Sequence, residues 1–274
     1  MEEGDRSWED MEMDCLFIIF SKLGLDDLST SIPFVCHSWS AAARHPFSWR
    51  ILNFRSIDFM PWSSFASRFK ALFHVSKFSF SGFIKLAIRR SEGFAGELWL
   101  PPLASVEDLI LASEGCPKLR KLALPGLTLK EETQIPILLS KWKELRLLEL
   151  ESKPSNFSQL VVKISQNCIH FIELKMPNSA INKDDVLAMH KYLPKLRSLD
   201  LSRAYLPKKE LLLIAEGCRE LQRLCVKNCV GFEEDEEVKR KACKIETFEC
   251  EGSKMIHEGG FGMDECDDLY VDVI

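Results

Sequence analysis

A nine-residue pattern recurs through the second half of this 274-residue chain and limits the folds open to it. It places apolar residues at fixed positions in 116–124, 142–150, 168–176, 193–201, 218–226 and, more loosely, 243–250. The central apolar residues of the pattern are 24 to 26 positions apart, and they are Leu122, Leu148, Leu174, Leu199, Leu224 and Phe248. Self-similarity with such a period is typical of proteins built from stacked structural repeats.

Each copy of the pattern predicts one short strand, because apolar residues at alternate positions place their side chains on one face. Helical spacing of apolar residues predicts helices between the strands, at 106–114, 156–167, 183–192 and 208–216. A single strand and helix cannot bury its own apolar face, whereas stacked copies can. The sequence therefore predicts an α/β fold, an open solenoid arc with parallel strands on the concave side and helices on the convex side.

Three further segments bear on the start of this stack. Leu98 lies 24 residues before Leu122, and Leu52 lies 46 residues before Leu98, which is nearly two periods. Both positions predict additional strands. Residues 78–80 (Phe-Ser-Phe) are a weaker candidate for one more.

The ten cysteines of the chain have two interpretations. Cys116, Cys168 and Cys218 lie six residues before their anchor leucines, where other repeats place Trp142 and Leu193. A position shared by Cys, Trp and Leu is apolar, so these thiols are predicted to be buried and reduced. The alternative is a zinc site, but its candidate ligands lack paired Cys-x-x-Cys spacing; they are Cys225, Cys229, Cys243 and Cys250.

Residues 8–50 differ from the repeats and predict a small module of three short helices. The first helix has an apolar face formed by Leu16, Ile19, Phe20 and Leu23. From the pattern alone, the module is either a cap on the repeat stack or a docking surface, since so small a unit exposes apolar residues that it cannot bury alone.

Two resemblances narrow these alternatives. The repeats resemble leucine-rich repeats of the cysteine-containing kind. Residues 8–50 closely resemble an F-box, with one departure: Met11 and Glu12 stand where F-boxes usually open with Leu-Pro. The chain is thus similar to the plant F-box/leucine-rich-repeat proteins. The residues that carry the F-box resemblance are Trp8, Met11, Asp14, Leu16, Ile19, Phe20, Leu23, Asp27, Leu28, Val35, Cys36, Trp39, Pro46 and Trp49.

The resemblance implies a non-catalytic substrate receptor of a Skp–cullin–F-box ubiquitin ligase, in which the F-box binds a Skp-type adaptor and the repeats bind the target protein. The implied adaptor-binding residues are Met11, Leu16, Ile19, Phe20, Leu23, Leu28, Pro33, Val35, Trp39 and Trp49. The residues that flank the strand anchors are predicted to face the target: Trp99, Lys121, Leu147, Glu149, Glu173, Lys175, Asp200, Arg223 and Glu249. The alternatives are an interaction scaffold without ligase function and a small-molecule sensor.

Charge is distributed unevenly along the chain, whose formal net charge is −5. Residues 38–90 contain nine basic residues and one acidic residue. They are interpreted as a solvated, partly irregular connection or, alternatively, as an anion site. The acidic end of the chain is predicted to be disordered. The expected division is an acidic N-terminus, the F-box, a basic connection with irregular first repeats, the leucine-rich repeats and an acidic tail: 1–7, 8–50, 51–94, 95–252 and 253–274.

Several classes of function find no support in the sequence. None of the six histidines lies in a recognisable nucleophile motif, and no glycine-rich phosphate loop occurs, so neither enzymatic activity nor a cofactor is expected. The net negative charge argues against nucleic-acid binding. No apolar run approaches the roughly 18 residues of a membrane helix. The protein is expected in the cytoplasm, the nucleus or both.

Overall fold

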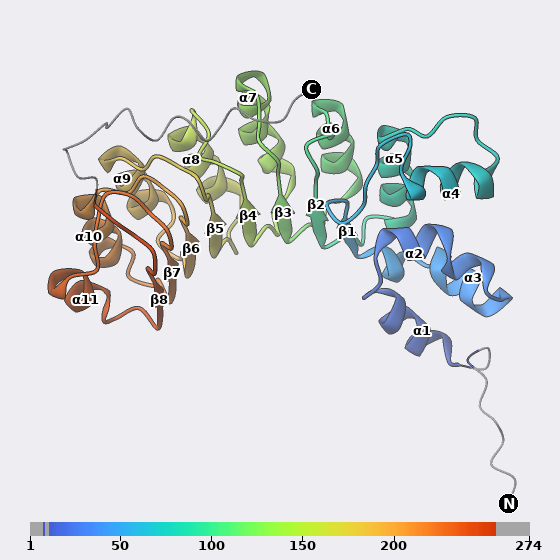
Figure 1. The fold of residues 1–274 in the computed structure, drawn as a ribbon, viewed down its shortest axis with the longest axis horizontal. Helices are drawn as coiled ribbons and strands as arrows, with labels where there is room; N and C mark the ends of the chain where they lie inside the picture. The colour runs from blue at the N-terminus through green and yellow to red at the C-terminus, as the bar shows by residue number, and fades with distance from the viewer. Residues whose placement is uncertain (1–7, 9–10, 256–274) are drawn as a thin grey trace, which may run out of the picture.

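The computed structural model describes Trp8 and residues 11–255, and its central feature is a parallel sheet of eight strands in chain order (Figure 1). The strands are β1 (Ile51–Asn53), β2 (Glu97–Trp99), β3 (Lys121–Ala123), β4 (Leu147–Glu149), β5 (Glu173–Lys175), β6 (Ser198–Asp200), β7 (Arg223–Cys225) and β8 (Thr247–Glu249). The predicted anchor residues pair with one another across the whole sheet, from Leu52 through Leu98 to Phe248. The predicted solenoid is confirmed.

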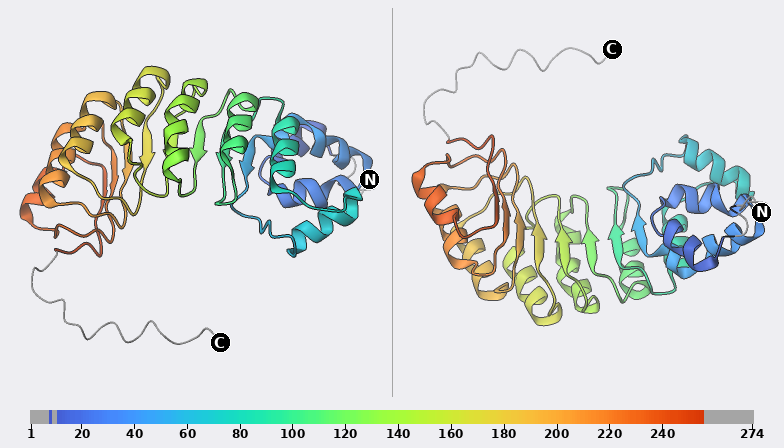
Figure 2. Two further views of the ribbon diagram at one scale, coloured as in Figure 1. Left: turned by 90° about the horizontal axis from the view of Figure 1, so that it is seen from above. Right: turned by 90° about the horizontal axis from the view of Figure 1, so that it is seen from below.

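Helices cover one face of the sheet, so that strands line the inner side of the arc and helices its outer side (Figure 2). They are α6 (Val106–Gly115), α7 (Leu129–Leu138), α8 (Phe157–Asn167), α9 (Lys183–Tyr192), α10 (Lys208–Gly217) and α11 (Glu236–Ala242). The four predicted helices are confirmed to within one residue at each end, whereas α7 and α11 were not predicted. Side chains of Ser105, Thr128 and Asn182 accept hydrogen bonds from backbone N–H groups in the first turns of α6, α7 and α9.

The last residues of α6 and α10 are glycines, and their neighbours leave no room for a side chain at either position. A β-carbon on Gly115 would lie 2.2 Å from Cγ2 of Ile88, and one on Gly217 would lie 2.0 Å from Cε1 of His190. Neither glycine is among the described residues with positive φ. Close approach of neighbouring helices, and not a left-handed backbone, therefore requires glycine at these positions.

The N-terminal module has the predicted three short helices, α1 (Met13–Phe20), α2 (Leu25–Thr30) and α3 (His37–Arg44). Two 3-10 turns, η2 (Ile32–Phe34) and η3 (Pro46–Trp49), follow α2 and α3. Helix α1 packs against α3 and η3. The buried side chains of the module come from every one of these elements except η2, and they are Leu16, Phe20, Leu25, Leu28, Ala42, Ala43 and Trp49.

The segment between β1 and β2 packs into the fold and is not the solvated connection that was predicted, but it is partly irregular, since 54–63 and 74–79 form no helix or strand. It contains α4 (Ser64–Phe73) and α5 (Phe80–Ser91). The candidate strand at 78–80 is also wrong, because Phe80 begins α5 and β1 pairs directly with β2. Phenylalanine rings pack together between these elements with centroids 4.4 to 6.2 Å apart, and they are Phe54, Phe59, Phe65, Phe69, Phe73, Phe78, Phe80 and Phe83. We call them the phenylalanine cluster.

Candidate functional site

The predicted adaptor-binding residues of the N-terminal module differ widely in exposure. Four are buried: Leu16, Phe20, Leu28 and Trp49. Four are partly buried: Met11, Leu23, Pro33 and Trp39. Ile19 and Val35 are exposed, with 37% and 57% of their surface accessible. The buried residues hold the helices together, and only the remainder can contact a partner without rearrangement of the module.

Trp39 shows how the core and the surface of the module are connected. Its ring lies edge-on to Phe20 of α1, with centroids 5.4 Å apart, and edge-on to Trp8 at 6.3 Å. The indole N–H of Trp39 donates to the carbonyl oxygen of Trp8 at 3.3 Å. Trp39 therefore joins α1, α3 and the residue that precedes α1.

Other exposed apolar residues of the module were not predicted as adaptor-facing. Met13, Ile18 and Phe34 are 36%, 66% and 53% exposed. With Ile19 and Val35 they form what we call the exposed apolar set. Helical periodicity selected the face that contains Leu16, Ile19 and Phe20, and Met13 and Ile18 of α1 lie outside it. Apolar residues repeated on one small module in this way are typical of an interaction surface.

The predicted target-facing residues lie on the strands, with one correction. Lys121 and Arg223 are exposed, and six others are partly buried: Trp99, Glu149, Glu173, Lys175, Asp200 and Glu249. The expectation that Leu147 is exposed is wrong, because only 5% of its surface is accessible. Its register partners are the longer charged residues Lys121 on β3 and Glu173 on β5, which flank it on both sides.

Most of the strand carboxylates already have a basic partner in the chain. Glu149 pairs with Arg55 at 2.6 Å, Glu173 with Lys175 at 3.6 Å and Glu249 with Lys227 at 2.8 Å. The hydrogen bond from Lys227 lowers the pKa of Glu249. Three of the four acids predicted to face the target are thus paired within the chain.

Arg55 forms a link across the first repeats that no sequence motif indicated. Its Nε donates to the carbonyl oxygen of Leu100 at 3.0 Å, its Nη2 to that of Leu124 at 2.9 Å, and its Nη1 to Glu149. Leu100 and Leu124 follow β2 and β3, so one guanidinium ties the loop after β1 to the ends of the next strands.

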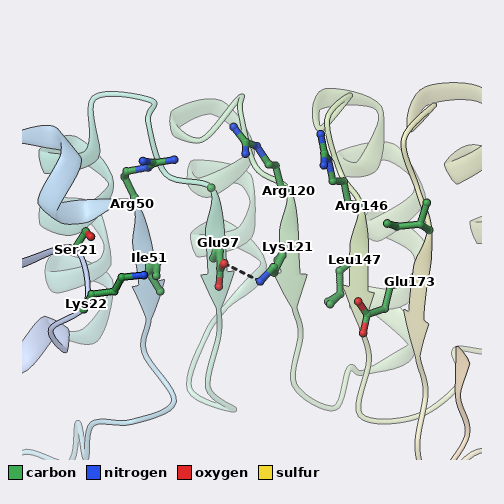
Figure 3. Close-up of a pocket in the computed structure, with 12 residues that line it drawn as sticks. Ser21, Lys22, Arg50, Ile51, Glu97, Arg120, Lys121, Arg146, Leu147 and Glu173 are labelled. Atoms are coloured by element: carbon green, nitrogen blue, oxygen red, sulfur yellow. Dashed lines mark ion pairs between the residues drawn. The ribbon is translucent and has the colours of Figure 1, made fainter. Parts of the chain in front are cut away.

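A basic cavity lies at the other ends of these strands (Figure 3). Its volume is about 420 Å³, and it opens between the α1–α2 turn and the starts of β1 to β5. Its lining contains five basic and two acidic side chains, and consists of Ser21, Lys22, Arg50, Ile51, Gly96, Glu97, Arg120, Lys121, Arg146, Leu147, Ile172 and Glu173. No prediction from sequence brought Lys22 of the N-terminal module together with the strand starts.

Comparisons with known proteins found relatives over most of the chain. No family model matches it. An Arabidopsis thaliana F-box/LRR-repeat protein is 28% identical over 234 residues, which cover 80% of this chain and 71% of that protein. The chain is thus similar over most of its length to F-box/leucine-rich-repeat proteins of this plant. Further relatives from Arabidopsis thaliana are F-box protein FBW2, 25% identical over 82% of this chain and 68% of the relative, and F-box protein SKIP1, 25% identical over 84% and 81%.

Two solved structures align with part of the chain. The tropomodulin C-terminal domain of Caenorhabditis elegans has a TM-score of 0.38 and 13% identity, and covers 61% of this chain and 90% of that domain. An internalin of Listeria monocytogenes has a TM-score of 0.37 and 12% identity, and covers 65% of this chain and 58% of that protein.

The three cysteines that precede the strand anchors are buried as predicted. Cys116, Cys168 and Cys218 are 0%, 3% and 8% exposed. Burial raises the pKa of Cys116 from 9.0 to about 12, and the pKa of Cys168 and of Cys218 to about 11. A thiol that stays protonated at neutral pH is a poor nucleophile.

We therefore expect alkylation to separate two classes of thiol in the folded protein. Iodoacetamide at neutral pH should modify the exposed Cys15 and Cys243 quickly, and Cys116, Cys168 and Cys218 only after unfolding. Peptide mass spectrometry after a short exposure measures this.

Because no described cysteine is paired, a reducing agent should leave the melting temperature unchanged. A drop of several degrees, with a mass change for lost cross-links, would show a disulfide.

The described residues contain no group of three or more His, Cys, Asp or Glu side chains placed to hold a metal ion. Among their helices, none is long and apolar enough to span a membrane.

Proposed function

We propose that this protein is the substrate receptor of a Skp–cullin–F-box ubiquitin ligase, with residues 8–50 binding the Skp-type adaptor and residues 95–252 binding the target. The observation that carries the proposal is the exposed apolar set on the F-box module. A module of this size buries one set of apolar side chains in its own core and presents a second set to solvent. The second set provides the contact area that a helical partner would cover.

The proposed role is positioning, not chemistry. The F-box is joined to the repeats through packed elements, since α2 contacts α4, and η3 contacts α5. A target held on the repeats would therefore keep a defined position relative to the adaptor. Holding a target lysine near an activated ubiquitin raises its effective concentration, which is sufficient for a receptor that has no catalytic group of its own.

Affinity purification of the tagged full chain from plant cells, with quantification of co-purified proteins, tests the proposal. We expect both a Skp-type adaptor and a cullin in amounts comparable to the chain. Adaptor without cullin would indicate the interaction scaffold without ligase function. Absence of both would show that the module only caps the repeat stack, a role that the departure from the F-box pattern at Glu12 would favour.

A further inference from the structure

The residue that directly precedes each strand occupies the same place in every repeat. It is arginine before four strands: Arg50 before β1, Arg120 before β3, Arg146 before β4 and Arg197 before β6. Because the strands are parallel and in register, these positions form a row along one edge of the sheet. Figure 3 shows the first three at that edge, around the basic cavity. We call them the arginine row.

The charges of the arginine row are largely uncompensated, in contrast to those of the strand carboxylates. Arg50 and Arg146 have no described carboxylate within ion-pair distance, and Arg50 instead lies 5.8 Å from the ring centre of Phe47. Arg120 is 3.9 Å from Glu144 and Arg197 is 3.8 Å from Glu220, with about half of each side chain in solvent. Exposed pairs at such distances contribute little. A chain of net charge −5 thus keeps a positive edge.

The cavity beside the row has room for a ligand because one position of the row is glycine. Gly96 precedes β2, between Arg50 and Arg120, and a β-carbon there would meet no atom closer than 4.0 Å. Both acids in the lining, Glu97 and Glu173, are paired with lysines, at 2.9 and 3.6 Å. The basic groups therefore dominate the site. Ile51 and Ile172 add apolar surface to its wall.

We propose that the arginine row and this cavity bind an extended acidic segment of the target protein. The inference rests on the proposed function and names the class of substrate. Neighbouring strands lie about 4.8 Å apart, so the row from β1 to β6 extends over roughly 24 Å. A small anion would occupy one part of it, whereas an extended peptide with carboxylates at alternate positions reaches several arginines. Each guanidinium can donate two parallel hydrogen bonds to one carboxylate.

The test uses the full chain co-expressed with the adaptor, and a fluorescent peptide that carries glutamate at alternate positions. Fluorescence anisotropy at low salt measures its affinity, against the same peptide with glutamine in place of glutamate. We expect only the acidic peptide to bind, more weakly as salt is raised. Arg50→Gln with Arg146→Gln should weaken binding by roughly tenfold for each arginine. The matched control, Lys183→Gln with Arg240→Gln, makes the same charge change on the exposed faces of α9 and α11, outside the cavity, and should leave affinity unchanged.

Four results would overturn the inference. They are equal binding of the glutamine peptide, equal loss in the control variant, complete displacement by inorganic phosphate, and a roughly tenfold gain when residues 256–274 are removed. Phosphate displacement would indicate a small-anion site, and the gain would make the acidic end of the chain itself the occupant. Adaptor co-purification is measured on the same samples. Failure of peptide binding with normal adaptor and cullin recovery rejects this inference alone, whereas loss of adaptor from the unmodified chain rejects the proposed function.

Discussion

Ile19→Asp combined with Val35→Asp should abolish co-purification of the Skp-type adaptor while leaving the chain folded. Both side chains belong to the exposed apolar set, so replacing them removes little packing within the module. An interface that covers these positions would have to bury two unpaired carboxylates, which costs several kcal/mol. A loss of that size in binding free energy is enough to prevent an interaction of moderate affinity from being detected. Quantification of adaptor recovered with the tagged chain measures the effect.

The control for this variant replaces two apolar residues of the repeats that are more exposed than Ile19 and Val35. Leu129 begins α7 and Ile169 follows α8, and they are 73% and 66% exposed. Leu129→Asp with Ile169→Asp should leave adaptor recovery and the melting temperature unchanged. Normal recovery with the F-box variant, or equal loss with the control, would remove the exposed apolar set as the docking surface.

Variants chosen from the sequence alone would not make this distinction. Helical spacing places Leu16 on the same stripe as Ile19, but Leu16 is fully buried and Ile19 is exposed. Truncating a buried leucine to alanine costs about 2–5 kcal/mol of folding free energy. Loss of adaptor binding by a Leu16→Ala variant would therefore report an unfolded module, whatever the role of its surface.

The strands and their register followed from the sequence because one buried residue per repeat fixes them. A fully buried leucine between two less buried neighbours recurs in β5, β6 and β7 and specifies which residues pair. Helix α7 was not predicted, because Pro136 inside it and the exposed Leu129 and Ile137 obscure its apolar stripe. Tertiary packing of the stripe that remains stabilises this helix in spite of its weak local signal.

The connection between β1 and β2 was misjudged because charge was given more weight than spacing. Phe65, Phe69 and Phe73 are four residues apart, which places their side chains on one side of a helix. That signal of α4 was present in the sequence. The nine basic residues of 38–90 were taken to indicate a solvated segment, but they occupy the surface of an ordered unit.

The pairing of the strand acids could not have been predicted. Arg55 is separated from Glu149 by 94 residues in the sequence, and only the folded arc brings them together. The same is true of the cavity, where Lys22 reaches the strand starts from the α1–α2 turn. The sequence indicates which residues lie on the strands. Whether each of their charges is paired with an opposite charge depends on contacts between distant repeats.

Phe83→Ala should lower the free energy of unfolding by about 3–5 kcal/mol. Phe83 lies in the middle of α5, is 2% exposed, and is within 6.2 Å of five other rings of the phenylalanine cluster. Removing the ring leaves a cavity that rigid aromatic neighbours on α4, α5 and the loop after β1 cannot fill. Denaturant unfolding followed by circular dichroism measures the loss.

The control for this prediction is a phenylalanine of the same segment outside the cluster. Phe94 is 39% exposed and has one ring neighbour, Phe47 at 5.4 Å. Phe94→Ala should therefore cost less than about 1 kcal/mol. Equal effects of the two substitutions would show that the cluster does not form a core. The cluster lies in the unit that the F-box contacts through α4 and α5, so its loss should also uncouple the F-box from the repeats. A folded repeat region with an earlier, separate transition for the N-terminal part is the expected unfolding profile of the Phe83→Ala chain.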